Sequence, residues 1–319
     1  MKKRKLLIST VLITVLLGIT MLTGCLDDYE DYEDYSDAEY SGDFDSADTS
    51  SFGSDVNLSD EASFPNGTCN ELDGNIVVVS IFANDYTSSW DFENPADVEM
   101  YDNMATRMRI GLDWLEQQAA NYGRNVKFIS NFSEDEELFY VADFDCDFAD
   151  NAYHFDAVMP FMDENMNALG AHLMEKYDAN NIFFALFLNK PEDTNMSSYA
   201  YPFYGSEMGF LYPYECAIYS SYVYGAQQGP AMYAHEVLHL FGAPDLYRPD
   251  TDGTNCGITQ EFSDYCRENH LNEIMFSNYD VTDNSVNFEA VTNELTNLTA
   301  YFIGWSDSDE ECEAFGISR

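Results

Sequence analysis

Basic residues are scarce in this sequence, which has 13 Lys and Arg against 58 Asp and Glu over 319 residues. The formal net charge is -45 at pH 7. Nucleic acids and anionic lipid surfaces are bound largely through Lys and Arg, so this charge balance excludes both as electrostatically held partners. A hydrophobic content of 45%, with 15% aromatic residues, still suffices for a globular core.

Two familiar metal-binding patterns are missing as well. The seven cysteines never stand in a CxxC spacing, which argues against a cysteine-ligated zinc cluster. The acidic segments 143–151 and 250–261 lack the glycine that an EF-hand loop requires at its sixth position, so neither is an EF-hand. Calcium binding by other carboxylates stays open, without a specific motif to support it.

The first 24 residues have the organisation of an export signal. A basic start, MKKRK, is followed by an apolar run and by small residues before Cys25. The tetrapeptide LTGC resembles a bacterial lipobox, whose cysteine is acylated and becomes the new N-terminus. The resemblance implies an extracytoplasmic protein that is lipid-anchored to the bacterial cell membrane. An ordinary signal peptide or an uncleaved membrane anchor is the alternative, because residues 6–22 are near the lower length limit for a span.

Residues 25–63 follow as an acidic segment with a threefold Asp-Tyr step, eight Ser and two Gly residues and no basic residue. This composition repels itself and cannot bury a core, which predicts a disordered tether. The alternative is a ligand for a basic surface partner. From residue 64 to residue 319 the composition is globular without another low-complexity linker, so we expect a single domain there.

Disulfides are expected in an exported domain. Six cysteines remain after Cys25, and this even number suggests up to three disulfides. Cys256 and Cys266 form the expected local pair, and the other pairings cannot be derived from sequence.

Strand-like and helix-like segments alternate in the globular part. Continuous apolar runs and β-branched residues predict strands at residues 75–83, 124–132, 137–144 and 181–189. Apolar residues recur at helical spacing in residues 95–123 and 162–177. This alternation predicts an α/β fold (α+β in the wider sense), with a sheet packed against long helices.

The segment AHEVLHLFGAPDLY, residues 234–247, carries the strongest chemical signal. It belongs to a predicted helix with Pro230 near its first turn and Gly242 just past its end. His235 and His239 stand four residues apart, so one helical face carries both imidazoles, and Glu236 lies beside them. The opposite face is apolar and should pack into the core through Ala231, Ala234, Leu238 and Phe241. An ordinary solvated helix with paired histidines is the alternative.

A catalytic zinc site needs three protein ligands and one open position. Gly242 can adopt the left-handed conformation and turn the chain back toward the metal, which brings Asp245 into range. The sequence therefore predicts a zinc ion held by His235, His239 and Asp245.

HEVLHLFGAPDLY resembles the metzincin zinc signature, HExxHxxGxx followed by a third ligand, in the variant with Asp at the third position. The continuation is similar to that of the immune inhibitor A group of secreted bacterial metallopeptidases, and snapalysin-type enzymes also use Asp there. The resemblance implies a zincin domain with a twisted, mostly parallel sheet, an active-site helix and a methionine turn beneath the metal. NEIMFSNYD supplies Met275 for that turn, and Tyr279 matches a tyrosine that some metzincins place near the metal. Residues 294–305 resemble the helix and Gly-Trp segment of immune inhibitor A relatives.

Other residues compete for the third ligand position. In the thermolysin-like arrangement this ligand is a Glu on a later helix, and Glu289 or Glu294 would serve. His270 is a further candidate. His154 and His172 show no metal-ligand spacing, so we expect neither to be a ligand.

These patterns predict a lipid-anchored zinc endopeptidase that acts on peptide or protein substrates, as a monomer. Zinc lowers the pKa of its bound water to about 7, and Glu236 is placed to act as general base. Tyr279 is a candidate for stabilising the oxyanion, with a packed aromatic as the alternative. The Tyr-rich residues 199–224 lie where metzincins place an edge strand that pairs with extended substrate. The second hypothesis is a cell-surface binding protein with this fold and no turnover; the presence of Glu236 favours the enzyme.

Overall fold

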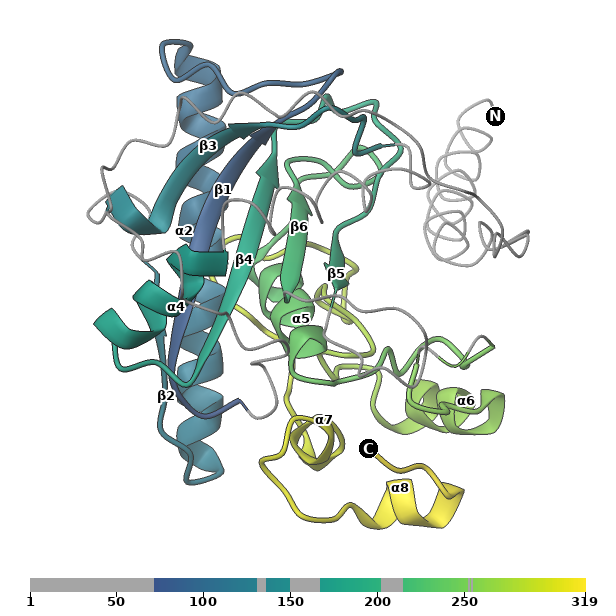
Figure 1. Ribbon diagram of the computed structural model, residues 1–319. Helices are drawn as coiled ribbons and strands as arrows, with labels where there is room; N and C mark the ends of the chain where they lie inside the picture. Colours follow the sequence, from purple (N-terminus) through teal and green to yellow (C-terminus); the bar gives the residue numbers. More distant parts are fainter. Residues whose placement is uncertain (1–71, 131–135, 150–166, 202–214, 252, 254) are drawn as a thin grey trace, which may run out of the picture. The chain divides into compact units, whose positions relative to one another are not determined.

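The computed structural model describes residues 72–130, 136–149, 167–201, 215–251, 253 and 255–319 (Figure 1). The predicted export signal and tether, together with Cys25, Cys69 and His154, lie outside the described residues. No helix in the described ranges is long and apolar enough to cross a membrane.

Strands and helices are mixed in the first part of the described chain, from residue 74 to residue 188, as predicted, whereas the C-terminal part consists of helices. The strands are β1 (Gly74–Asn84), β2 (Val126–Ile129), β3 (Phe139–Asp143), β4 (Asn181–Leu188), β5 (Tyr199–Tyr201) and β6 (Cys216–Ser220). The helices are α2 (Pro95–Asn121), α4 (Asn167–Lys176), α5 (Pro230–Leu240), α6 (Gln260–Asn269), α7 (Asn297–Phe302) and α8 (Glu310–Phe315), and η2 (Glu136–Leu138) is a 3-10 turn.

The strands form one mostly parallel sheet in the order β2-β1-β4-β6-β5. The long strand β1 pairs in parallel with β4 along one side, and with β2 and then β3 along the other. Strand β6 pairs in parallel with β4, whereas β5 pairs with β6 in the antiparallel direction. The α/β class with a mostly parallel sheet is therefore confirmed, and among the described strands β5 forms an antiparallel edge.

The central strands β1 and β4 are mostly apolar because both faces of the sheet are covered. In β1, Ile76, Val78 and Phe82 pack into the core on the side of α2 and α5. The residues between them, which include Val77 and Val79, pack into a second core that contains residues of α4. Figure 1 shows α2 and α5 on one face of the sheet and α4 on the other.

Helix α2 packs against α5. It begins after Asn94, whose side chain accepts the N–H of Ala96, and it buries an apolar face toward the sheet. At Gly111 the two helices approach so closely that a Cβ there would lie 2.7 Å from the carbonyl oxygen of Pro230. Glycine at this position therefore lets the backbone of α5 rest directly on α2.

The described cysteines are free thiols: Cys146, Cys216, Cys256, Cys266 and Cys312. The expected local pair of Cys256 and Cys266 is not formed in this structure, which corrects that prediction. Cys256 Sγ lies 3.8 Å from the carbonyl oxygen of Gly242. Cys266 is fully buried on α6, between Phe262 and His270, whose side chains contact α8. The two thiols therefore take part in different contacts.

Candidate metal centre

Helix α5 holds the two histidines on a rigid support. It starts at Pro230 after Gly229, and nearly every residue along it is buried. A Cβ on Gly229 would lie 2.6 Å from the carbonyl oxygen of Asn287, so glycine allows the segment around Asn287 to lie against the start of the helix. The predicted apolar face is confirmed, because Ala231, Ala234, Leu238 and Phe241 are all buried.

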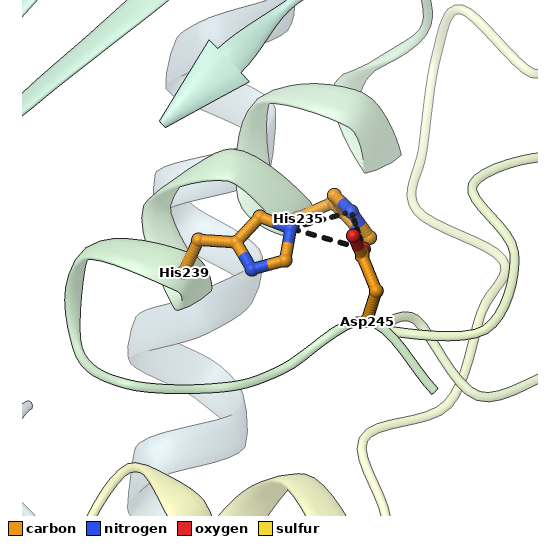
Figure 2. Close-up of side chains that lie close together, drawn as sticks. All are labelled: His235, His239 and Asp245. Carbon is orange, nitrogen blue, oxygen red and sulfur yellow. Dashed lines mark hydrogen bonds and ion pairs between the residues drawn. The ribbon is translucent and has the colours of Figure 1, made fainter. Parts of the chain in front are cut away.

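The chain reverses after α5 as the sequence predicts. Gly242 has a φ of 97°, in the region that favours glycine, and its N–H donates to the carbonyl oxygen of His239. The reversed chain brings Asp245 back to the face of α5 that carries His235 and His239 (Figure 2).

Three ligand-type atoms converge at this point. His235 Nε2 and His239 Nε2 lie 3.0 Å apart, and Asp245 Oδ1 lies 3.3 Å from the first and 3.1 Å from the second. Among the described residues, these three form the only group of three or more His, Cys, Asp or Glu side chains whose ligand atoms all lie within 4.8 Å of one another.

The hydrogen bonds of the two histidines determine which nitrogens face the centre with a lone pair. His235 Nδ1 lies 2.8 Å from the carbonyl oxygen of Ile274, and His239 Nδ1 lies 2.7 Å from that of Ala243. A carbonyl can only accept, so each Nδ1 carries the hydrogen, and each Nε2 of a neutral ring presents a lone pair. No described residue donates a hydrogen bond to the buried Asp245 Oδ1. Three electron-rich atoms thus face one another, an arrangement that requires a cation or a shared proton.

The electrostatics of the site also favour a positive charge. Burial opposes a charge on His239, yet its pKa is raised because the Asp245 carboxylate favours the imidazolium form. Burial likewise opposes ionisation of Asp245, but the two imidazoles hold the pKa of this carboxyl well below its usual range. The Asp245 carboxylate therefore favours a positive charge at this point, from a proton or from a cation.

The spacing and chemistry of the three atoms fit zinc. Tetrahedral zinc with bonds of about 2.0–2.1 Å places its ligand atoms about 3.3–3.4 Å apart. The observed separations of 3.0, 3.1 and 3.3 Å are close to this triangle. Two imidazoles and one carboxylate suit zinc better than calcium or magnesium, which take oxygen ligands.

The predicted methionine turn lies directly against the site. Met275 is fully buried, and its carbonyl oxygen accepts the N–H of Leu246, the residue after Asp245, at 3.0 Å. The preceding carbonyl, of Ile274, is the one that receives the Nδ1 hydrogen of His235. Two consecutive carbonyls of this turn therefore fix one histidine and the chain that carries the aspartate.

Glu236 lies on the same helix and is 5% exposed. Burial raises its pKa to about 7; the neighbouring His235 lowers it, and Asp245 raises it further. A carboxylate with a pKa in this range can accept and return a proton near neutral pH.

The rival ligands lie elsewhere. Glu289 and Glu294 are exposed and do not belong to the three-residue group. His270 Nε2 lies 2.8 Å from Glu311 Oε2, and His172 Nε2 lies 3.1 Å from Glu137 Oε2. Both described histidines outside the site are therefore engaged with carboxylates.

Tyr279 is half-buried, and its backbone carbonyl accepts the side-chain amide of Asn293, which also donates to the carbonyl of Ser277. The structure therefore anchors the backbone of this tyrosine, and an interaction of its hydroxyl with substrate stays a prediction.

In the acidic segment 143–149, the carboxylate of Asp147 interacts with a buried lysine. Lys190 is fully buried, and its Nζ contacts Asp85 Oδ2 and lies 3.0 Å from Asp147 Oδ1. The ammonium of Lys190 thus lies where a cation between these two carboxylates would lie.

Sequence reasoning missed one residue of the site, Asn255, whose side chain binds the backbone of Asp245. Asparagine in a Gly-containing loop is common in turns, so its sequence context carries no signal for this role.

Comparison with known proteins adds no relative: no protein-family model matches the chain, and no curated protein matches it. The function is therefore inferred from the residues and geometry of the site.

Proposed function

We propose that this protein is a zinc-dependent endopeptidase of the metzincin type. The observation that carries the proposal is the convergence of His235 Nε2, His239 Nε2 and Asp245 Oδ1 at 3.0–3.3 Å, with both Nδ1 hydrogens directed away to carbonyls. Glu236, in the HExxH pattern and buried beside the site, supplies the second element that hydrolysis needs.

Each residue has a defined role in this proposal. His235, His239 and Asp245 would hold the metal, and a zinc ion bound there would supply an acidified water molecule and polarisation of the substrate carbonyl. Glu236 accepts the proton of that water and returns it to the leaving amine. The raised pKa of Glu236 suits both steps, because its carboxyl exchanges a proton near neutral pH. Tyr279 is the candidate for stabilising the developing oxyanion.

A peptide substrate is supported by the position of β5. This antiparallel strand is last in the sheet order and packs near α5, which carries the metal ligands. An edge strand can pair with an extended peptide through main-chain hydrogen bonds. The acidic net charge of -45 excludes nucleic acid as an electrostatically held partner.

The N-terminal sequence indicates where the proposed enzyme is located. Acylation of Cys25 would hold the enzyme on the outer side of the bacterial cell membrane, with residues 25–63 as the tether. We propose that the enzyme acts there as a monomer.

The experiment that tests the activity uses Glu236→Gln in the full chain. We expect this variant to retain about one zinc ion per chain and to lose nearly all cleavage of casein or a peptide library, because Glu236 is a base and not a ligand. Glu268→Gln, an exposed carboxylate on α6, is the control and should cleave normally. Undiminished cleavage by Glu236→Gln, or cleavage by wild type that a chelator does not affect, would contradict the mechanism.

The same experiment distinguishes the enzyme from the second candidate, a surface binding protein. A surface binding protein without turnover would bind zinc and cleave nothing in the wild-type form. Glu236 favours the enzyme, since a binding protein has no use for a buried carboxylate that titrates near pH 7 beside its metal ligands.

A further inference from the structure

The loop after Asp245 folds back so that the side chain of Asn255 contacts the backbone of Asp245. Asn255 is 3% exposed, and its side-chain amide faces the backbone of residues ten and seven positions earlier in the chain. Its Oδ1 accepts the N–H of Asp245 at 2.8 Å, and its Nδ2 donates to the carbonyl oxygens of Asp245 at 2.9 Å and Arg248 at 2.6 Å. One side chain thus satisfies both backbone groups of the residue that supplies the carboxylate ligand.

Only one orientation of the amide fits these partners. The two groups on the nitrogen side are carbonyls, which only accept, and the group on the oxygen side is an N–H, which only donates. Asparagine matches all three with its own donor and acceptor. Neither aspartate nor a hydroxyl residue supplies two donors and one acceptor in the same plane.

The loop itself is braced so that Asn255 keeps this position. The Asp250 carboxylate accepts the N–H of Gly253 at 2.6 Å and that of Gly257 at 2.8 Å. The Asp250 N–H donates to the carbonyl oxygen of Ile258, which closes the loop at its base. Asn255 is therefore presented by a closed loop rather than by a free side chain at the surface.

The backbone of the aspartate is held on two sides. Asn255 binds Asp245 itself, and the carbonyl of Met275 binds the N–H of the next residue, Leu246. The histidine ligands need no such brace, because a helix fixes their backbone. Asp245 lies on a loop, where its carboxylate would otherwise lose conformational freedom upon metal binding.

We propose that Asn255 is a positioning residue for the zinc site, which fixes the peptide backbone of Asp245 so that its carboxylate is pre-oriented toward His235 and His239. The proposal rests on the proposed function in so far as the bound metal is zinc. Residues that orient metal ligands in this way typically contribute about 10–100-fold to metal affinity.

The test measures the zinc affinity of the full chain, purified in detergent, by competition with a chromophoric chelator. Asn255→Ala removes all three hydrogen bonds, and Asn255→Asp keeps the acceptor for the Asp245 N–H while losing both donors. We expect the dissociation constant for zinc to rise at least about tenfold in both variants. Asn272→Ala is the matched control, because its amide also donates to a backbone carbonyl, that of Thr292, and it should bind zinc like wild type.

A purely structural role would give a different result. In that case the free energy of unfolding of the metal-free variants would fall, while the dissociation constant for zinc would stay within about twofold of wild type; this outcome would overturn the proposal. If Asn255→Ala does not fold, Asn255→Asp decides the question. Wild-type protein that binds zinc but cleaves no peptide would contradict the proposed function alone, and the comparison of zinc affinities would still decide the role of Asn255.

Discussion

Glu273 offers a quantitative test of how the segment around Met275 is held. Its side chain is 1% exposed, and its carboxylate accepts the N–H of Thr296 at 2.8 Å and the hydroxyl of Thr299. The next two carbonyls of the chain, of Ile274 and Met275, accept hydrogen bonds from His235 and from the loop that carries Asp245. A substitution of Glu273 therefore affects the segment that contacts His235 and the loop of Asp245.

The magnitude follows from the pKa. Burial raises the pKa of Glu273 from 4.5 to about 7, and the two threonines lower it only in part. One pKa unit corresponds to about 1.36 kcal/mol, so ionisation of this carboxyl costs the folded state about 3 kcal/mol relative to the unfolded chain. Because the folded pKa is the higher one, the favourable contribution is complete below about pH 4.5. It is lost as the pH rises toward 7.

Glu273→Gln keeps the shape of the side chain and removes its charge. The amide oxygen can accept from Thr296, and the amide N–H can donate to the hydroxyl of Thr299, which also accepts. We expect the variant to gain up to about 3 kcal/mol of unfolding free energy over wild type between pH 5 and pH 8, because only wild type carries the buried charge at the higher pH.

The assay is urea unfolding of the metal-free chain at pH 5, 6, 7 and 8, with chelator present so that zinc binding does not contribute to the pH dependence. Glu268→Gln removes an exposed carboxylate on α6 that does not contribute to the pKa of Glu273, and it should change the unfolding free energy by less than about 0.5 kcal/mol. A difference between Glu273→Gln and wild type that is the same at all four pH values would refute the reasoning.

Two further predictions concern the ligands and the helix contact. Asp245→Ala should lose zinc, whereas Asp245→His should retain it and Glu289→Ala and Glu294→Ala should bind it normally, as measured by zinc content after dialysis. Loss of zinc in either Glu variant, with zinc retained in Asp245→Ala, would replace the metzincin assignment by a thermolysin-like one. Gly111→Ala should lower the free energy of unfolding by about 1–3 kcal/mol, because the new Cβ would lie 2.7 Å from the carbonyl oxygen of Pro230. A stabilised Gly111→Ala protein in thermal unfolding, as expected for an unobstructed helix, would show that the helices are not in such close contact.

Local sequence patterns determined the elements that position the site. The apolar runs at β1 and β4 predicted buried strands because both faces of a covered parallel sheet demand apolar residues. The spacing of His235 and His239 predicted a shared face because the period of the helix is fixed by backbone geometry. Gly242 predicted a chain reversal because a left-handed residue favours glycine.

The tertiary structure decided what those patterns left open. It placed Asp245, and neither Glu289 nor Glu294, beside the two imidazoles, and it separated Cys256 from Cys266. It also brought the amide of Asn255 onto the backbone of Asp245. These contacts depend on how loops fold back over the sheet and helices, and loop paths are set by hydrogen bonds between segments rather than by any local periodicity. A single sequence therefore predicts the helix and its two histidines, whereas the groups that complete and orient the site emerge only when the chain is packed.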